Sequence, residues 1–229
     1  YMLDALPLYD IVFSYSMSLF NTIERLNAKR IEYLPFAFNP EIHKKVLLNN
    51  NQESIYSCDI AFVGTWDENR EKTLEDLFDL NLGIWGPGWN KISRFSKLSS
   101  CVKKVGIIDY NETSKIYQNA KIVLNPLRDQ NSDSHNMKSF EIPMMGGLMC
   151  SRRTADHDNF FGDSNDILLY ENNDSLRRVI LGYLNSDIKP KFSNDHYKIF
   201  LKKHTYCNRA KFIIDKIEEV RSKKIRYTK

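Results

Sequence analysis

Short apolar runs alternate with amphipathic segments along most of this chain, and that alternation restricts its fold more than any other feature. The pattern is typical of β-α-β units, in which each helix connects two parallel strands of one sheet. Strands are expected at Asp10–Ser14, Arg30–Leu34, Asp59–Gly64, Leu82–Trp85, Val105–Ile108, Lys121–Asn125, Leu148–Ser151 and Ile167–Tyr170. Helices are expected at Glu68–Asp79, Glu112–Asn119, Met137–Met145, Ala155–Phe161, Ser175–Asn185, His196–His204 and Cys207–Lys224. The predicted fold class is therefore α/β, with a doubly wound parallel sheet.

The composition is ordinary for a soluble globular protein. With 229 residues and 42% hydrophobic content, the chain can bury a substantial core. The formal net charge of +4 is too small to indicate nucleic acid as a partner. Basic residues gathered in 221–229 are expected at a solvated helix end, and peripheral membrane contact is the alternative.

No apolar run reaches membrane-spanning length, and the N-terminal residues 3–13 are too interrupted by Asp and Pro to predict a signal peptide. The cysteines lack Cys-x-x-Cys spacing and a neighbouring His that would suggest a metal site. We expect buried, reduced thiols in a cytoplasmic protein, at Cys58, Cys101, Cys150 and Cys207.

A break in the alternation indicates a domain boundary. Pro35, Pro40 and the polar run at 49–52 interrupt the rhythm of strands and helices. The residues before the break supply only a strand, a helix and a strand. We therefore expect one unit at 1–45, a second at 52–210, and a C-terminal helix with a basic tail at 211–229.

The first predicted binding loop follows the strand Asp59–Gly64. Gly64 allows close backbone approach at the strand end where open α/β sheets bind ligands. Thr65 can donate to a phosphate, and Arg70 can bind one through two guanidinium N–H groups. The alternative is that Arg70 pairs with a nearby carboxylate such as that of Asp67.

Two more predicted strands end in segments that contain glycine. Pro87-Gly88 fits a type II turn, in which Gly88 takes a positive φ. Gly86, Gly88 and Trp89 therefore form either a structural turn or part of a ligand cleft. The next strand ends in Gly106, Ile107 and Ile108, which either contact a ligand or only pack at the sheet edge.

The most informative motif runs from Asp133 to the paired glycines 146–147. Asp133 precedes Glu141 by eight positions, and Glu141 lies early in a predicted helix. The backbone N–H groups of residues 135–137 would face a phosphate at the start of this helix, and Glu141 would accept from ribose hydroxyls. The alternative is ordinary capping by Asn136 or Ser134, with Glu141 solvated.

Other polar residues crowd the same loop. Arg128, Asn136, Met137 and Lys138 are assigned to phosphate binding with the helix start. Asp133 is expected to orient the sugar. His135 is expected to donate to a leaving phosphate oxygen or, as the alternative, to be hydrogen-bonded within the fold. The catalytic candidates are Asp133, His135 and Glu141.

Asp156 and Asp158 form the only Asp-x-Asp pair, a spacing that can hold a divalent cation. They follow Thr154, which is expected to cap a helix, so we interpret them as acidic residues of a first helical turn. The sequence therefore predicts no metal and no bound cofactor.

Several segments, each weak alone, resemble one known family when taken in order. They are Leu34-Pro-Phe, Phe62-Val-Gly-Thr, Gly86-Pro-Gly-Trp, His135–Pro143, Gly146-Gly and Lys203-His-Thr-Tyr206. This set resembles the GT-B glycosyltransferases of the group 1 type, and most closely their CgeB-like, spore-maturation branch.

The resemblance implies a Rossmann-like donor domain that takes a sugar from a nucleoside-diphosphate sugar. It implies a diphosphate contact near Arg70, a nucleotide cleft beside Gly86–Trp89, and backbone contacts to the base from Gly106–Ile108. Asp133 replaces a Glu that is commoner in the superfamily and has a longer reach. Transfer is expected to proceed without a metal, through electrostatic stabilisation of the departing nucleoside diphosphate.

Residues 1–45 then correspond to the end of an acceptor domain, and we expect the chain to bind donor while transferring sugar poorly. The acceptor, whether glycan, protein or small molecule, is not indicated. Two rival functions are a nucleotide or nucleotide-sugar binding module without turnover, and a flavodoxin-like phosphate-binding regulator.

Overall fold

A computed structural model describes residues 3–48, 55–131, 133–162, 166–187 and 192–227. Its main feature is a parallel sheet of six strands in the order β5-β4-β3-β6-β7-β8. These strands are β3 (Cys58–Val63), β4 (Leu82–Gly86), β5 (Val102–Val105), β6 (Ala120–Asn125), β7 (Met149–Arg152) and β8 (Leu168–Tyr170).

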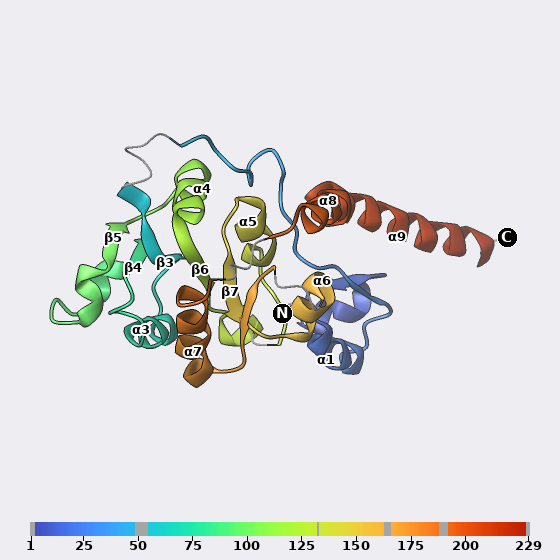
Figure 1. Ribbon diagram of the computed structural model, residues 1–229. Coiled ribbons are helices and arrows are strands. Elements are labelled where there is room, and N and C mark those ends of the chain that lie inside the picture. Colours follow the sequence, from blue (N-terminus) through green and yellow to red (C-terminus); the bar gives the residue numbers. More distant parts are fainter. Residues whose placement is uncertain (1–2, 49–54, 132, 163–165, 188–191, 228–229) are drawn as a thin grey trace.

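The strand order places β3 in the middle of the sheet. From β3 the chain adds β4 and β5 on one side, then crosses over and adds β6, β7 and β8 on the other (Figure 1). This is the 3-2-1-4-5-6 order of the Rossmann fold, in which ligands bind outside the carboxyl ends of the strands where the order reverses. The predicted doubly wound α/β class is confirmed, and the reversal lies between β3 and β6.

Helices cover both faces of the sheet, and each face buries its own hydrophobic cluster. Leu74, Leu176 and Ile180 on one face come from α3 (Glu68–Glu75) and α7 (Asn173–Leu184). The helices on the other face are α4 (Tyr110–Asn119), α5 (Lys138–Met144), α6 (Ala155–Phe161) and α8 (Asn194–Lys203). Short 3-10 helices complete the connections, at η3 (Trp89–Lys91), η4 (Lys97–Ser100) and η5 (Asp129–Asn131).

One strand differs from its predicted position. The sequence predicts Val105–Ile108, whereas β5 spans Val102–Val105 and pairs Val102 with Ile84 of β4. Gly106 ends the strand with a φ of 119°, and Ile107 is 86% exposed. The apolar run was misleading because β5 is an edge strand, whose lysines keep it soluble while the isoleucines lie in the following loop.

Residues 3–33 form a small unit with its own sheet. It contains η1 (Leu3–Leu8), β1 (Val12–Ser14), η2 (Met17–Leu19), α1 (Phe20–Arg25) and β2 (Ile31–Tyr33). β1 and β2 pair in parallel, with Val12 opposite Ile31. The long helix α9 (Tyr206–Tyr227) lies against this unit, where Arg30 Nη2 donates to Glu219 Oε2 at 2.7 Å. The C-terminal helix therefore joins the small unit to the six-stranded domain (Figure 1).

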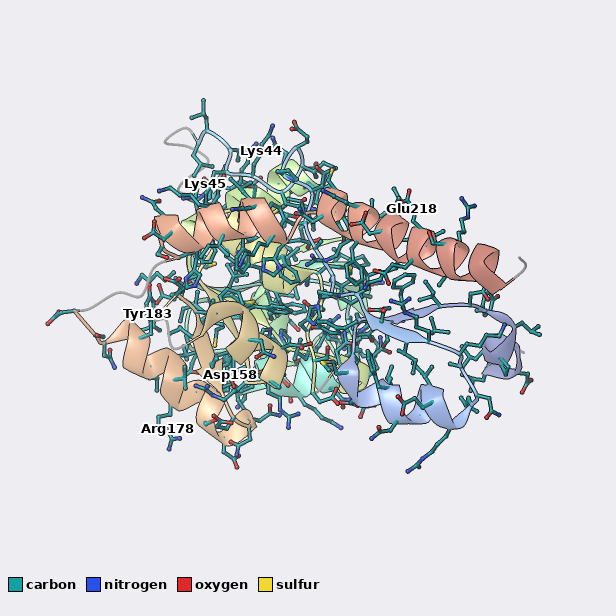
Figure 2. The ribbon with its side chains drawn as sticks, turned by 90° about the vertical axis from the view of Figure 1, so that its right-hand side faces the viewer. Lys44, Lys45, Asp158, Arg178, Tyr183 and Glu218 are labelled. Carbon is teal, nitrogen blue, oxygen red and sulfur yellow. The ribbon has the colours of Figure 1, made fainter. Side chains whose placement is uncertain are left out.

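The segment after β2 packs closely onto the six-stranded domain. Phe38 is fully buried, its N–H donates to His204 O at 3.1 Å, and Tyr206 N–H donates to Phe38 O at 3.1 Å. Figure 2 shows Lys44 and Lys45 of this segment on the side of the molecule opposite Arg178 of α7. Residues 34–48, called the linker below, are therefore anchored to the six-stranded domain at Phe38, while Leu47 near their end is 97% exposed.

Three of the four cysteines are buried as predicted, and the prediction is wrong for Cys207, which is exposed on α9. None of the helices that the structure describes is long and apolar enough to cross a bilayer.

Substitution of Gly86 tests how the ends of β3 and β4 are fitted together. Gly86 has a φ of 141°, and a Cβ added there would lie 2.2 Å from the Gly64 carbonyl oxygen. Because the obstacle is backbone, Gly86→Ala should lower the free energy of unfolding by at least about 2 kcal/mol in urea titrations. Gly182→Ala on α7 is the control, since its added Cβ meets nothing within 4 Å, and it should stabilise by about 0.5–1 kcal/mol. Equal effects of the two substitutions would contradict the close-approach argument.

Candidate functional site

The carboxyl ends of β3, β4 and β5 are linked through glycines. Gly64 N–H donates to Trp85 O at 2.8 Å, and Gly106 N–H donates to Gly86 O at 3.1 Å. Gly88 has a φ of 83° and a ψ of −5°, the dihedrals of the third position of a type II turn. Trp89 is buried, and its Nε1–H donates to Gly64 O at 2.8 Å. The buried Trp89 side chain thus holds the end of β3 in place through this hydrogen bond. This position does not fit the predicted role of Trp89 in a ligand cleft.

Two arginines share one carboxylate beside this edge. Arg70 Nε lies 3.3 Å from Asp67 Oδ2, and Arg128 Nε lies 3.6 Å from the same oxygen. Arg70 Nη1 also donates to the carbonyl of Thr65 at 2.8 Å. The alternative pairing of Arg70 with Asp67 is therefore present. Both Arg70 Nε and Asp67 Oδ2 nevertheless lack a hydrogen bond from the described residues.

Lys138 brings a third cation to the same place. Its ammonium group lies over the Phe62 ring, 5.3 Å from the centroid, and donates to the carbonyl of Val63. Arg70 lies over the same ring at 5.5 Å. Burial lowers the pKa of Lys138 to about 8, with a further lowering from Arg70. A buried cluster of like charges is costly, and an anion would relieve that cost.

Glu141 lies one turn into α5 and is close to Lys138. Its side chain is 18% exposed, and its carboxylate receives no hydrogen bond from the described residues. Burial raises the pKa of Glu141, while Lys138 opposes that shift. A largely buried carboxylate that accepts from no described residue is unusual in a folded protein, which makes Glu141 a candidate for accepting hydrogen bonds from a ligand.

The remaining predicted residues beside the sheet edge are accessible. Thr65 and Ile107 are exposed, whereas Ile108 packs partly against the core next to α4. The loop at 106–109 follows β5 and leads directly into α4. Its backbone is therefore reachable from the same side as the strand ends.

Comparison of the sequence with protein-family models shows the family of this chain. Residues 69–215 match the model described as glycosyl transferase-like. The chain belongs to the glycosyl transferase-like family. No curated protein sequence matches it significantly.

Several solved structures have a similar fold, which is the GT-B fold of glycosyltransferases. Sucrose-phosphate synthase from Thermosynechococcus elongatus is 13% identical with a TM-score of 0.67, covering 96% of this chain and 61% of that one. The E. coli structure titled trehalose-6-phosphate bound with UDP-2-fluoro glucose is 14% identical with a TM-score of 0.67, covering 93% and 62%. The Anabaena HepE structure with UDP and glucose is 9% identical with a TM-score of 0.65, covering 93% and 64%. This chain thus spans about three fifths of the length of each.

In this glycosyl transferase-like chain, the predicted catalytic His135 lies in the core. Phe36 N–H donates to Nε2 at 3.0 Å, so the ring proton is on Nδ1, which lies 2.6 Å from Asp156 Oδ2. The ring is fully buried. These contacts fit the alternative of a hydrogen-bonded histidine, and both nitrogens are closed to a phosphate.

Asp156 is more than an acidic residue in a first helical turn. It is buried, and besides His135 it accepts from Ser134 Oγ at 2.6 Å and from Tyr33 OH at 2.8 Å. The small N-terminal unit and the six-stranded domain are therefore joined through one buried carboxylate. Sequence reasoning missed this role because Tyr33 lies 123 positions away along the chain.

Three other predicted residues lie at the start of α5. Asn136 and Asn125 exchange amide hydrogen bonds of 3.0 and 3.2 Å, and Met137 is 43% exposed. Asp133 is exposed. Neither Asn136 nor Ser134 caps α5, whose N-cap residue Met137 makes no side-chain cap bond, so that alternative is wrong.

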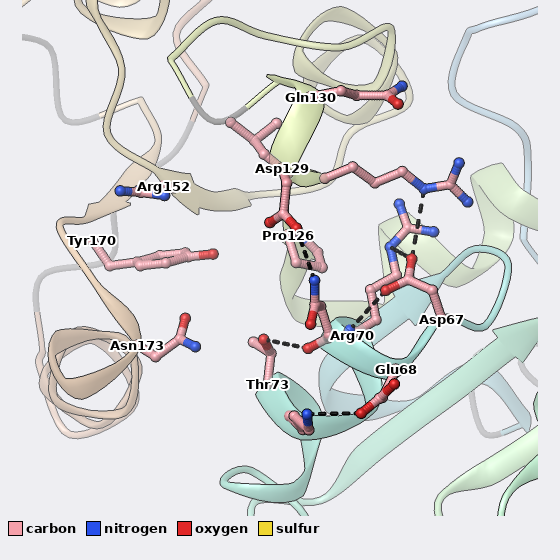
Figure 3. Close-up of a pocket in the computed structure, with 14 residues that line it drawn as sticks. Asp67, Glu68, Arg70, Thr73, Pro126, Asp129, Gln130, Arg152, Tyr170 and Asn173 are labelled. Carbon is pink, nitrogen blue, oxygen red and sulfur yellow. Dashed lines mark hydrogen bonds and ion pairs between the residues drawn. The ribbon is translucent and has the colours of Figure 1, made fainter.

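A polar cavity of about 720 Å³ adjoins the arginine pair on the α3 and α7 side of the sheet. Figure 3 shows Arg152, Tyr170 and Asn173 facing Pro126 and Asp129 across it. Of the predicted site residues only Arg70 and Arg128 line this cavity. The cavity therefore adjoins Arg70 and Arg128, and Glu141 does not line it.

Among the described residues, no group of three or more His, Cys, Asp or Glu side chains is arranged to hold a metal ion. Asp156 is committed to its hydrogen bonds, and Asp158 pairs with Arg153 at 2.6 Å. Metal independence stays a prediction.

Asp156→Asn should lower the free energy of unfolding by about 2–4 kcal/mol, because it weakens three hydrogen bonds to a buried carboxylate. The exposed Asp158→Asn is the control and should cost no more than about 1 kcal/mol. Burial raises the pKa of Asp156, but its hydrogen bonds outweigh burial and hold that pKa below the usual value. The Asp156 contribution is thus present above its unfolded-state pKa and lost as pH falls through the lower folded-state pKa. Urea unfolding at neutral and strongly acidic pH measures this, and equal costs for the two variants would contradict it.

Proposed function

We propose that this chain is the donor-binding part of a GT-B glycosyltransferase that moves a sugar from a nucleoside-diphosphate sugar to an acceptor. The observation that carries the proposal is the gathering of Arg70, Arg128 and Lys138 at the carboxyl ends of β3 and β6, where Asp67 pairs with the two arginines, and burial and then both arginines lower the pKa of Lys138. Three cations gathered in this way would suit a polyanion.

The diphosphate would take the place that Asp67 holds in part. Arg70 and Arg128 have planar guanidinium groups suited to two phosphate oxygens, and their contacts to Asp67 are long enough to be exchanged. Lys138 supplies a point charge from a site with little water, where its attraction for phosphate is strong. These cations would stabilise the charge on the departing nucleoside diphosphate without a metal.

The nucleoside would lie on the other side of Lys138. Glu141 would accept from the ribose hydroxyls, and the backbone of Gly106–Ile108 would contact the base. Gly86 and Gly88 keep side chains away from the same edge, while Asp133 would orient the sugar from its exposed loop. In this proposal, residues far apart in sequence would bind the diphosphate, the ribose and the base of one donor.

The comparisons support this proposal at the level of fold and donor class. Two similar structures are described with UDP-2-fluoro glucose and with UDP and glucose, which favours a UDP-type donor here. Membership of the CgeB-like branch, a cytoplasmic location and peripheral membrane contact through the basic tail rest on the sequence alone. The acceptor is left open as a glycan, protein or small molecule.

Calorimetry with UDP-, GDP- and ADP-glucose, in EDTA and then with Mg²⁺ or Mn²⁺, tests the proposal. One donor should bind in EDTA with unchanged affinity after metal is added. Release of free sugar by the same sample separates a transferase site from a binding module without turnover. Failure of all three donors and their nucleoside diphosphates to bind would refute the proposal, and strict metal dependence would refute its metal-free mechanism.

Arg70→Ala should weaken binding of a nucleoside diphosphate by about tenfold to a hundredfold, and leave binding of the nucleoside unchanged, because the guanidinium acts on phosphate oxygens. Lys72→Ala is the matched control, since Lys72 lies on the same helix but pairs with Glu68 at the surface. Equal losses for both ligands, or none, would assign Arg70 to the surface ion pair alone.

Glu141→Gln should weaken binding of the nucleoside diphosphate by about 1–3 kcal/mol, the scale for hydrogen bonds to a charged group. The same substitution should not affect binding of pyrophosphate, which has no ribose. Titration calorimetry measures both, with a thermal melt to show that the fold is intact. Unchanged nucleoside diphosphate affinity would remove Glu141 from the site.

A further inference from the structure

The linker carries one histidine to the nucleoside end of the proposed site. Its middle part is anchored to the six-stranded domain, where Ser114 Oγ of α4 donates to Lys44 O at 2.7 Å. His43 is buried, and its own N–H donates to Asn39 O at 2.7 Å. Backbone hydrogen bonds at Lys44 and at His43 itself therefore hold His43 in place.

The hydrogen bonds of His43 define which nitrogen carries the proton. Asn39 N–H donates to His43 Nδ1 at 3.0 Å, so Nδ1 is an acceptor and the proton is on Nε2. Burial lowers the pKa of His43, which favours this neutral form. The ring thus presents a single N–H group on its far side.

That N–H group faces Glu141, and none of the described residues accepts a hydrogen bond from it. His43 Nε2 is buried without a hydrogen bond from the described residues, and it lies 3.6 Å from Glu141 Oε1. This separation is too long for a hydrogen bond. The two side chains are 5% and 18% exposed, so a donor lacking an acceptor faces an acceptor lacking a donor in a largely dry setting.

The surroundings of His43 connect it to the loop at 106–109, part of which is proposed to contact the base. Its ring meets that of Tyr110 edge-on, with centroids 4.9 Å apart. Tyr110 opens α4 directly after the loop at 106–109. His43 therefore lies between Glu141 and the segment proposed to contact the base.

We propose that His43 is a positioning residue for Glu141, and that the linker is thereby part of the ribose-recognition site. When ribose hydroxyls donate to the Glu141 carboxylate, His43 Nε2–H closes onto Oε1 and fixes the plane in which the carboxylate accepts. Hydrogen bonds in a buried network strengthen one another, so ligand and histidine bind the same carboxylate cooperatively. This inference rests on the proposed function, because it assigns a partner to the residue that binds ribose there.

The test uses the whole chain and compares ribose with deoxyribose. The probes are UDP, GDP and ADP, each with its 2′-deoxy and 3′-deoxy form, titrated by calorimetry. For the nucleoside diphosphate that binds wild type best, His43→Phe should weaken the ribose form about tenfold and leave the deoxy form that lacks the recognised hydroxyl nearly unchanged. A ring that acted only in packing would weaken all forms alike.

Two further variants test the same proposal if His43→Phe folds poorly. His43→Gln places an N–H near the Nε2 position and should restore most of the preference for ribose, whereas His43→Asn reaches only the Nδ1 side and should not. Glu41→Ala, an exposed change in the same segment, is the control and should leave the preference unchanged.

The outcomes separate the two proposals. Loss of the ribose preference in His43→Phe and its return in His43→Gln supports the inference. A preference that falls in Glu141→Gln but survives in His43→Phe, or equal behaviour of His43→Gln and His43→Asn, overturns the inference and leaves the proposed function standing. Wild-type protein that binds none of the nucleoside diphosphates overturns both.

Discussion

The parallel pairing of β3 with β6 is the constraint on which the site depends. Cys58 pairs with Ala120 and Ala61 with Val123, so two strands that are far apart in sequence end at the same edge. The loop after β3 carries Asp67 and Arg70, and the loop after β6 carries Arg128 and leads to α5. Because helices leave these strands toward opposite faces of the sheet, the two loops diverge and leave the edge between them open.

The positive charges at this edge of the sheet lower the stability of the fold. Arg70 and Lys138 both lie over Phe62; burial and then Arg70 lower the pKa of Lys138, while burial and then Arg128 lower that of Arg70. Asp67 offsets only part of this, because it also caps α3 by accepting from Arg70 N–H at 3.0 Å. Sites that break a local rule of stability are expected at functional positions, and the excess of positive charge here supports the proposal that this edge binds an anion.

The sequence predicts the scaffold well because strand periodicity and helix caps are local signals. The six strands of the main sheet were all expected, and β5 was misplaced only because Ile107 and Ile108 belong to a loop. Arg70, Arg128, Lys138 and Glu141 can be chosen as candidates from the sequence because each follows a strand end or lies in the first turn of a helix, and their roles remain predictions. The roles of His43 and Asp156 could not be predicted, because they depend on tertiary contacts between distant segments, and no local pattern distinguishes a buried linker histidine from a solvated one.

A two-stranded sheet such as β1–β2 is marginal by itself, so the small unit depends on what holds it to the six-stranded domain. The partly buried Tyr33–Asp156 and Phe36–His135 hydrogen bonds attach it near the start of α5, and α9 attaches its other side through Arg30. The linker leaves between these attachments and reaches Glu141 through His43. Rotation of the small unit must break the two hydrogen bonds beside α5 or displace the linker. Its position and the geometry of the nucleoside end are therefore coupled by the same set of contacts.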